Sequence, residues 1–357
     1  MKKVLITGIL GQIGSYLADL YLENDYEVAG TIRRSGIDHF QNIEHIKDRV
    51  KLFPADITDI SSLLYTFNVC KPDIVINCAA QSEVGTSFSN PCTTFDITGK
   101  GVLNLLEVIR QFYPKTKFLQ FSSSEMMGSS FSLINGEKYQ DENTALHPMS
   151  PYAVAKLAGH HMVKVYRESY GLFASNIVAF NNESPRRKDY FVTRKITKWI
   201  GEFINWIQES DNGLNEQGFF ADHPDNNRIY INPFSNEPNF PKLALGNIDS
   251  VRSWTHTKDT ARAAKLILEY KDPEDFCIGS PECYSVRDFL ETSFSLCGLD
   301  WKDYVYQDPQ FMRPNDLTFL RPYPQKAKDL LGWEQEISFR DLVKEMVEYD
   351  VQKAKEK

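Results

Sequence analysis

The chain opens with a short apolar run that leads directly into a glycine-rich turn. Residues 4–7 read as a strand, Gly8, Gly11 and Gly14 follow, and residues 13–22 have the apolar spacing of a helix. Such a turn constrains the fold strongly, because its backbone amides and the helix N-terminus can hold a pyrophosphate. A tight turn without a ligand is the alternative, and the flanking strand and helix argue against it.

Strands and helices continue to alternate along the first half of the chain. The expected strands are residues 27–29, 51–53, 73–77, 118–121 and 173–180, and the expected helices are 60–67, 101–112 and 151–170. For the last helix, Ser150 is well placed as the N-cap and Pro151 as the first residue. This alternation predicts an α/β fold with a Rossmann-type, doubly wound parallel sheet.

Composition excludes several classes of partner. The net charge of −8 over 357 residues argues against a nucleic-acid or membrane-surface role. The six cysteines form no CxxC pair and no spacing with His that suggests zinc, so we expect free thiols in a reducing compartment and no metal. No signal peptide and no apolar stretch of membrane-spanning length is found. We therefore predict a cytoplasmic protein.

The segment 209–241 differs from the rest of the chain. It is rich in Asn, Asp, Gly and Pro with interleaved aromatic residues, and regular patterns resume with helices expected at 258–270, 285–297 and 338–351. A stretch of this length without regular structure is usually functional or mobile. It is interpreted as an unusual insertion that forms a lid, an oligomer contact or a tolerated surface loop.

Several residues after the strands suit a dinucleotide cofactor. Arg33 and Arg34 follow the second strand where NAD-selective folds place an acid, which favours the 2′-phosphate of NADP over NAD. A solvated basic pair is the alternative. Asp56 ends the third strand, where it could read the adenine amino group or cap a turn. The small residues Ala79 and Ala80 end the fourth strand and allow close approach of a cofactor.

A tyrosine and a lysine lie one helical turn apart at the start of the helix 151–170. Tyr152 and Lys156 share one helical face, and a positive charge near Tyr152 favours a phenolate that can accept a hydroxyl proton during hydride transfer. Glu125 follows residues 122–124 at the preceding strand end, so we expect it in the same crevice, where a carboxylate can remove a carbon-bound proton. Packing of Tyr152 and a helix-start role for Glu125 are the alternatives.

Together these residues resemble the extended short-chain dehydrogenase/reductases and, within them, the GDP-mannose 4,6-dehydratase family. The resemblance runs from Val4 to about Asp350 and is broken chiefly by residues 209–241. Its most diagnostic part is the run from Glu183 to Ile196. Ser-x-Glu at 123–125, residues 150–156 and the pair at 313–314 are further matches.

The motifs and the resemblance imply roles for individual residues. The implied catalytic residues are Ser123, Glu125, Tyr152 and Lys156. The candidate cofactor-binding residues are Gly8, Gly11, Gln12, Ile13, Gly14, Arg33, Arg34, Asp56, Ile57, Ala79, Ala80, Gln81, Ser82, Tyr152, Lys156, Asn182, Glu183 and Arg187. The implied substrate-binding residues are Ser87, Asn181, Lys195, Arg252, Arg313 and Asp316.

The resemblance also implies an activity and an organisation. The expected enzyme is an NADP-dependent hydro-lyase that converts a GDP-hexose, GDP-mannose or a close relative, to its 4-keto-6-deoxy derivative. Residues 1–180, joined by part of 243–270, would form the NADP-binding domain, and residues 181–357 would form mainly the smaller C-terminal nucleotide-sugar-binding lobe. By family analogy, helices 101–112 and 151–170 would build a homodimer, and a homotetramer is the larger alternative.

Some positions depart from the family pattern and leave more than one activity open. Ser123 stands where the family has Thr, Met127 where it has Tyr, and Asn182 where it has His. Because these changes cluster where the sugar would lie, another GDP-sugar such as a GDP-heptose is an alternative substrate. An NDP-sugar epimerase or decarboxylase of the same superfamily, and a cofactor-binding protein without turnover, are two further hypotheses.

Overall fold

The computed structural model describes residues 1–33, 40–209, 240–312, 317 and 319–356. The chain divides into two compact units. Unit 1 consists of Met1–Asn182, Ser253–Glu282 and Leu320–Glu336, and unit 2 consists of Glu183–Arg252, Cys283–Phe319 and Ile337–Lys357. The candidates Arg34, Arg313 and Asp316, and most of the segment 209–241, lie outside the described residues.

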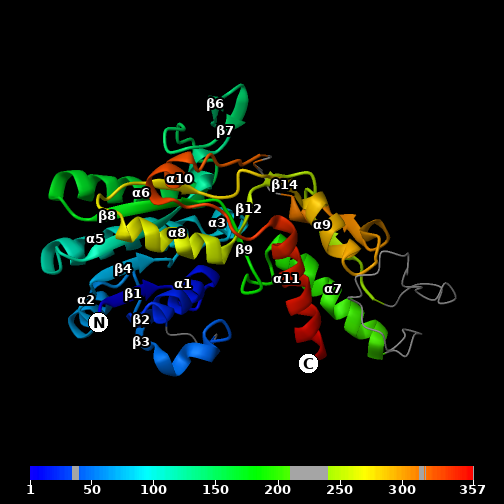
Figure 1. Ribbon diagram of the computed structural model, residues 1–357, viewed down its shortest axis with the longest axis horizontal. Helices are drawn as coiled ribbons and strands as arrows, with labels where there is room; N and C mark the ends of the chain where they lie inside the picture. The colour runs from blue at the N-terminus through cyan, green and yellow to red at the C-terminus, as the bar shows by residue number, and fades with distance from the viewer. Residues whose placement is uncertain (34–39, 210–239, 313–316, 318, 357) are drawn as a thin grey trace. The chain divides into compact units, whose positions relative to one another are not determined.

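Unit 1 is built on a seven-stranded sheet in which every neighbouring pair of strands is parallel (Figure 1). Its strands are β1 (Lys3–Thr7), β2 (Glu27–Ile32), β3 (Lys51–Pro54), β4 (Ile74–Asn77), β5 (Lys117–Ser123), β8 (Ala174–Ala179) and β13 (Phe276–Ile278). Their spatial order is β13-β8-β5-β4-β1-β2-β3. The predicted doubly wound parallel sheet is confirmed.

Helices cover both faces of this sheet because successive strand residues point to opposite sides. Val4 and Ile6 pack in one apolar cluster with α1 (Gln12–Glu23), α8 (Thr257–Glu269) and α10 (Gln325–Leu331). Leu5 packs in the other with α2 (Ile60–Cys70), α5 (Gly101–Phe112) and α6 (Pro151–Tyr170). The segment 320–336, which carries α10, joins unit 1 from late in the chain.

The helix α6 has strong signals at both ends. The Ser150 Oγ accepts the Ala153 N–H at 3.1 Å, and Pro151 occupies the first turn, where a missing N–H costs nothing. At the other end, Gly171 takes a left-handed conformation with φ of 67°. The predicted start of this helix is confirmed, and it brings Tyr152 and Lys156 into its first turns.

Shorter elements complete unit 1. They are the helical segments Glu44–Arg49, α3 (Val84–Ser89), α4 (Pro91–Phe95), Asp96–Lys100 and Ser124–Met127, the hairpin of β6 (Ser132–Ile134) and β7 (Glu137–Tyr139), and the pair of β9 (Asn181–Glu183) with β12 (Trp254–His256).

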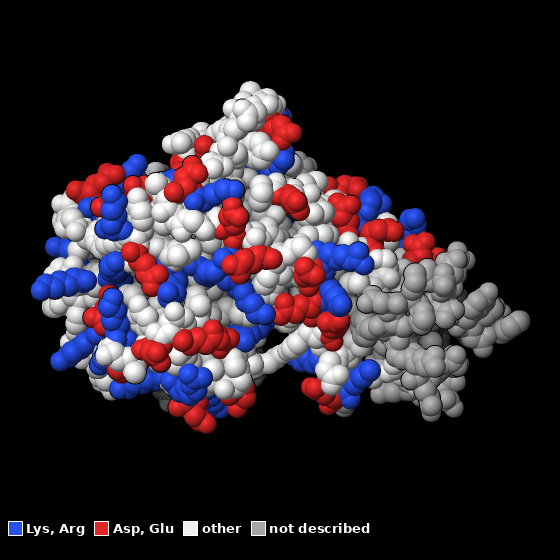
Figure 2. All heavy atoms as spheres, viewed as in Figure 1, with Lys and Arg blue, Asp and Glu red and all other residues white. Residues whose placement is uncertain are grey.

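Figure 2 shows Lys and Arg side chains interspersed with Asp and Glu over the face in view. Mixed charge of this kind gives little long-range attraction for a polyanion.

Unit 2 is a smaller, mainly helical body. Its helices are α7 (Val192–Glu209), α9 (Val286–Ser295) and α11 (Phe339–Lys355), and its strand pairs are β10 (Leu243–Leu245) with β15 (Val305–Gln307) and β11 (Val251–Arg252) with β14 (Tyr284–Ser285). Arg194 on α7 forms a buried ion pair with Asp350 on α11 at 2.6 Å. Gly201 allows these two helices to approach, because a Cβ there would lie 2.4 Å from the Asp350 carbonyl oxygen.

Three general features concern membrane spans, cysteines and metal ligands. Among the described residues, no helix is long and apolar enough to cross a membrane. The six cysteines are free thiols. In the part of the chain that the structure describes, no group of three or more His, Cys, Asp and Glu side chains could hold a metal ion.

Gly14 is expected to be intolerant of any side chain. A Cβ at this position would lie 2.5 Å from the Gly8 carbonyl oxygen and 2.8 Å from the Ile9 Cα, so the backbone of the turn would have to move. We expect Gly14→Ala to lower the free energy of unfolding by about 1–3 kcal/mol, the usual cost of overpacking, as measured by urea denaturation. Gly85→Ala is the control, because a Cβ there meets nothing within 4 Å. Equal stability of the two variants would contradict this account of the turn.

Candidate active site

The glycine turn lies where the order of the strands reverses. β1 is flanked by β2 on one side and β4 on the other, and ligands of doubly wound sheets bind at the carboxyl ends of strands at such a point. Gly8 has φ of 67°, and a Cβ there would lie 3.0 Å from both the N and the Cα of Ala79. The turn and the end of β4 are therefore in direct contact, an approach that only glycine allows here, and the backbone amides of a turn of this kind at a helix start can hold a pyrophosphate.

Three other cofactor candidates of unit 1 make hydrogen bonds within the protein. Gln12 Nε2 donates to the Asn182 carbonyl at 2.9 Å, which joins the start of α1 to β9. The Gln81 N–H donates to Thr98 Oγ1 at 3.1 Å. Asp56 Oδ1 accepts from the Thr58 N–H at 2.9 Å and from its hydroxyl at 2.7 Å. This is the contact of a turn cap, the second of the two roles considered for Asp56.

Four further cofactor candidates are Ile13, Ile57, Ala80 and Ser82. Ile57 is buried, and its carbonyl accepts from Asn104 on α5 at 2.9 Å. Ile13 lies shortly after Gly8, and Ala80 and Ser82 follow Ala79. None of the three is fully buried. The predicted roles of these residues toward a cofactor stay predictions.

Lys156 is buried and anchors α6 to β5. Its Nζ donates to the Phe121 carbonyl at 2.5 Å and lies 5.9 Å from the centre of the Tyr152 ring. Burial lowers the pKa of the Lys156 amine to about 8, against a smaller opposing effect of Cys78. The amine is thus largely protonated at neutral pH, beside a tyrosine that is itself buried.

Ser123 and Glu125 lie at the carboxyl end of the same strand. Ser123 Oγ accepts the Glu125 N–H at 3.3 Å, which starts the short helical segment Ser124–Met127. Met126 and Met127 are buried, while Glu125 stays partly exposed. The structure therefore brings the four predicted catalytic residues to β5 and to the helix anchored on it.

Most of the remaining candidates lie in unit 2 or at its boundary, and Ser87 lies on α3 in unit 1. Glu183 Oε2 accepts from Thr193 at 2.5 Å and lies 3.5 Å from the Arg187 Nε. Burial raises the pKa of Glu183, and Arg187 and Thr193 oppose this shift. Lys195 Nζ donates to the Ala244 carbonyl at 3.1 Å and lies 3.7 Å from the centre of the Phe311 ring.

Two substrate candidates make hydrogen bonds to nearby backbone, and a third is partly exposed. Arg252 is buried, and its Nη1 donates to the neighbouring Val251 carbonyl at 2.9 Å. The Ser87 hydroxyl donates to the Val84 carbonyl at 2.7 Å within α3. Asn181 opens β9 and is partly exposed. Their predicted contacts with a substrate stay predictions.

Sequence reasoning did not single out the buried polar residues that support this site. Gln120 lies within the apolar run Phe118–Phe121, yet its Oε1 accepts from Asn77 at 2.7 Å and its Nε2 donates to the Phe121 carbonyl at 2.9 Å. The Phe121 carbonyl is also the acceptor for Lys156. A polar residue inside a buried strand is the signal that could have identified Gln120.

The parallel sheet, the glycine turn and the helix with Tyr152 and Lys156 define an enzyme of the short-chain dehydrogenase/reductase type. Solved structures with this fold include a UDP-glucose 4-epimerase from Thermotoga maritima, with TM-score 0.79, 23% identity, and coverage of 98% of this chain and 99% of that chain. A dTDP-glucose 4,6-dehydratase from Bacillus anthracis in complex with NAD has TM-score 0.78, 20% identity, and coverage of 99% and 98%.

Sequence comparison narrows the class to one family. The family model for GDP-mannose 4,6 dehydratase matches residues 5–210 and 235–346. GDP-mannose 4,6 dehydratase 2 of Arabidopsis thaliana is 40% identical over 366 residues, which cover 99% of this chain and 88% of the relative. The human GDP-mannose 4,6 dehydratase is 36% identical over 375 residues, covering 98% and 91%. The chain belongs to the GDP-mannose 4,6-dehydratase family, as its motifs predicted.

We expect Lys156 to titrate well below an ordinary lysine. Burial disfavours its charged form, so its ε-carbon signal in NMR of lysine labelled with ¹³C should change with a midpoint near the pKa of about 8. Exposed lysines should change near about pH 10.4. Lys156→Met identifies the signal by removing it. A Lys156 midpoint equal to that of the exposed lysines would contradict the buried, dehydrated position.

Proposed function

We propose that this protein is a nucleotide-sugar 4,6-dehydratase that removes water from a GDP-hexose with NADP as its cofactor. The observation that carries the proposal is the hydrogen bond from Lys156 to the Phe121 carbonyl. It fastens the helix that carries Tyr152 to the strand that ends at Ser123 and leads to Glu125. A group for hydride transfer and a group for removing a carbon-bound proton thus belong to one site. Membership of the dehydratase family supports the same reaction.

Three of the proposed catalytic residues carry out the proton transfers of the reaction. Tyr152 accepts the proton of the C4 hydroxyl, and the positive charge of Lys156 stabilises the phenolate that does so. When bound, NADP would supply the acceptor for the C4 hydride and the hydride donor for C6. Once C4 is a ketone, the C5 proton is acidic, and Glu125 removes it as the C6–O bond breaks. The C5 proton passes from Glu125, directly or through the Ser123 hydroxyl, to the departing hydroxide, so one water leaves. The proton held by Tyr152 returns to C5 as hydride is added at C6, so the cycle is redox-neutral.

NADP is the proposed form of the cofactor. Solved structures with this fold are described as complexes with NAD or with NADPH. For this chain, Arg33 at the end of β2 supports NADP, because a guanidinium binds a phosphate through paired, charge-assisted hydrogen bonds. Asn182, Glu183 and Arg187 complete the proposed cofactor-binding set.

The GDP-sugar is proposed to bind through cationic and amide side chains. Lys195 and Arg252 carry the positive charge that a diphosphate requires, and Asn181 adds hydrogen bonds. Ser87, Arg313 and Asp316 are the further proposed contacts. Homologues of this family are named for GDP-mannose, which makes GDP-mannose the first substrate to test.

The proposed enzyme is a cytoplasmic homo-oligomer. The free thiols of the six cysteines suit a reducing compartment. Phe112 on α5, and Val165 and Tyr170 on α6, are large apolar side chains that are exposed. Their burial against a second copy would support a homodimer, to which a homotetramer adds a further interface.

Glu125→Gln is expected to block elimination without blocking the first oxidation. With GDP-mannose and NADP, the variant should lose about 10²- to 10⁴-fold in formation of the dehydrated product, the usual contribution of a general base. Mass spectrometry measures the loss of one water, and absorbance measures NADPH that builds up because the cycle stops after C4 oxidation. Glu137→Gln on the hairpin is the control and should turn over normally. Continued water loss in Glu125→Gln would refute its role, and products that are only epimers in the wild type would refute dehydration.

Arg33→Ala is expected to weaken NADP binding selectively. Loss of a charge-assisted hydrogen bond to the 2′-phosphate should raise the Kd for NADP about tenfold or more and leave the Kd for NAD unchanged. Titration calorimetry with both dinucleotides measures the difference. Arg49→Ala removes another exposed arginine of unit 1 and should change neither Kd. An equal loss of affinity for NAD and NADP would contradict recognition of the phosphate by Arg33.

A further inference from the structure

A row of buried polar side chains crosses the sheet beneath α6. The pairing register places one such residue on each of four adjacent strands, in the order Thr7, Asn77, Gln120 and Asn176. Two positions earlier on each strand the row is apolar and packs against the helices of the same face: Leu5, Val75, Phe118 and Ala174. Polar groups in such a position require partners.

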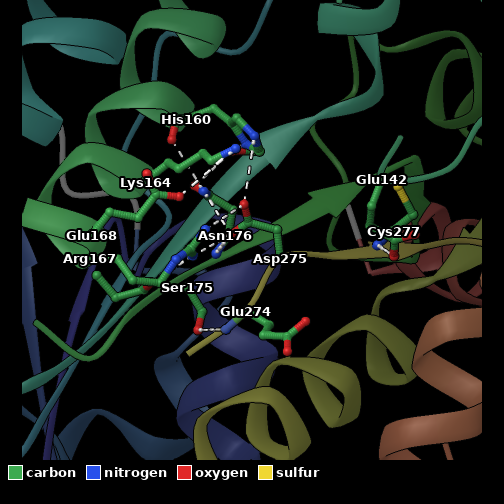
Figure 3. Close-up of polar contacts among 12 residues, drawn as sticks. Glu142, His160, Lys164, Arg167, Glu168, Ser175, Asn176, Glu274, Asp275 and Cys277 are labelled. Atoms are coloured by element: carbon green, nitrogen blue, oxygen red, sulfur yellow. Dashed lines mark hydrogen bonds and ion pairs between the residues drawn. The ribbon is translucent and has the colours of Figure 1, made fainter. Parts of the chain in front are cut away.

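Side chains on one face of α6 contact β5, β8 and the residue just before β13. Lys156 donates to the Phe121 carbonyl on β5. One turn later, His160 Nδ1 lies 3.1 Å from the Ser122 Oγ, also on β5. Two turns beyond, Arg167 donates to the Ala174 carbonyl at 2.9 Å and reaches Asp275, just before β13 (Figure 3). The helix is therefore attached to the sheet at three positions along its length.

Asp275 is the point where these attachments meet. Its carboxylate accepts from both terminal nitrogens of Arg167, at 2.8 Å and 3.0 Å. It also accepts from the backbone and side-chain N–H groups of Asn176, at 2.9 Å and 3.0 Å. The preceding Glu274 N–H donates to Ser175 Oγ, which fixes the main chain beside Asp275 against β8. Asp275 is thus held rigidly on the sheet while it holds Arg167 of the helix.

Asn176, which is bound to Asp275, also contacts the middle of α6. Asn176 Nδ2 donates to the His160 carbonyl at 3.2 Å, and its Oδ1 accepts the single proton of the Ser122 hydroxyl at 3.2 Å. The other ring nitrogen of His160, Nε2, lies 3.9 Å from Asp275 Oδ2. Burial lowers the pKa of His160 to about 4, although Asp275 opposes this shift, so the ring is neutral at neutral pH.

We propose that Asp275 is a positioning residue for the reaction: by holding Arg167 and Asn176 it fixes α6 along the sheet, and so fixes where Tyr152 and Lys156 stand relative to Ser123 and Glu125. The residue lies about one hundred positions from α6 in the sequence and acts through that helix. The proposal rests on the hydride-transfer role proposed for Tyr152 and Lys156. Asp275 is suited to the task because a planar guanidinium–carboxylate pair fixes both distance and angle.

Asp275→Asn tests the proposal in the full-length protein. The change keeps the shape of the side chain and removes its charge. We expect kcat for dehydration of GDP-mannose to fall about ten- to hundred-fold, as misplacement of a reacting group by about 1 Å does, with the KM unchanged. The Lys156 midpoint measured by ¹³C NMR should rise from about 8 toward an ordinary lysine, because a displaced helix admits water to the amine.

Two further variants keep the outcome decisive. Glu142→Gln makes the same acid-to-amide change at a partly buried carboxylate that accepts from the Cys277 N–H of β13, and it should leave kcat and the Lys156 midpoint unchanged (Figure 3). If Asp275→Asn does not fold because Arg167 loses its partner, Asp275→Asn combined with Arg167→Met removes both charges. This double variant should fold and show the same loss of kcat.

The possible results separate the two proposals. A wild-type kcat and Lys156 midpoint in Asp275→Asn, or in the double variant, would overturn the positioning role. Equal losses in Glu142→Gln would overturn it as well, since they would reflect a general weakening of the strand. If the wild-type protein dehydrates no GDP-sugar, the proposed function fails. The Lys156 midpoint still tests the position of α6 in that case, because it requires no turnover.

Discussion

The burial of one lysine against a strand carbonyl is the interaction on which the rest of the site depends. Lys156 is 5% exposed, and its ammonium donates to the Phe121 carbonyl at 2.5 Å. Removing an ammonium from water is costly unless strong hydrogen bonds replace its hydration. The helix α6 therefore cannot slide along the sheet without breaking this hydrogen bond. The same bond holds the helix that carries Tyr152 against the strand that leads to Glu125.

The parallel sheet decides where this chemistry takes place. Because neighbouring strands all run the same way, their carboxyl ends share one edge, and the order of strands reverses between β1 and β4. At that point the chain has no side chain at Gly8, where a Cβ would meet the backbone of Ala79. Glycine at position 8 therefore allows the turn and the end of β4 to meet closely. The glycine turn and the start of α6 both belong to the seven-stranded sheet unit.

Much of the fold could be predicted from the sequence because its signals are local. The period of apolar residues predicted the strands β1 to β5 and the helix α5, and the Ser150–Pro151 pair predicted where α6 begins. The spacing of Tyr152 and Lys156 on one helical face likewise needs only helical geometry. The role of Asp56 could not be decided from local sequence signals. An acid after a strand suits an adenine or a turn cap equally, and only the structure reveals its bonds to Thr58.

By itself, the sequence determined the class of fold, the glycine turn and the set of groups available for catalysis, since each depends on residues close together in the chain. The tertiary structure alone decided which of these groups meet. Asp275 binds Arg167 across 108 positions, and the segment 320–336 joins a unit built mainly from the first half of the chain. Neither contact leaves a periodic signal in the sequence. Both arise because burying polar groups forces them to find partners wherever the packed sheet brings them near.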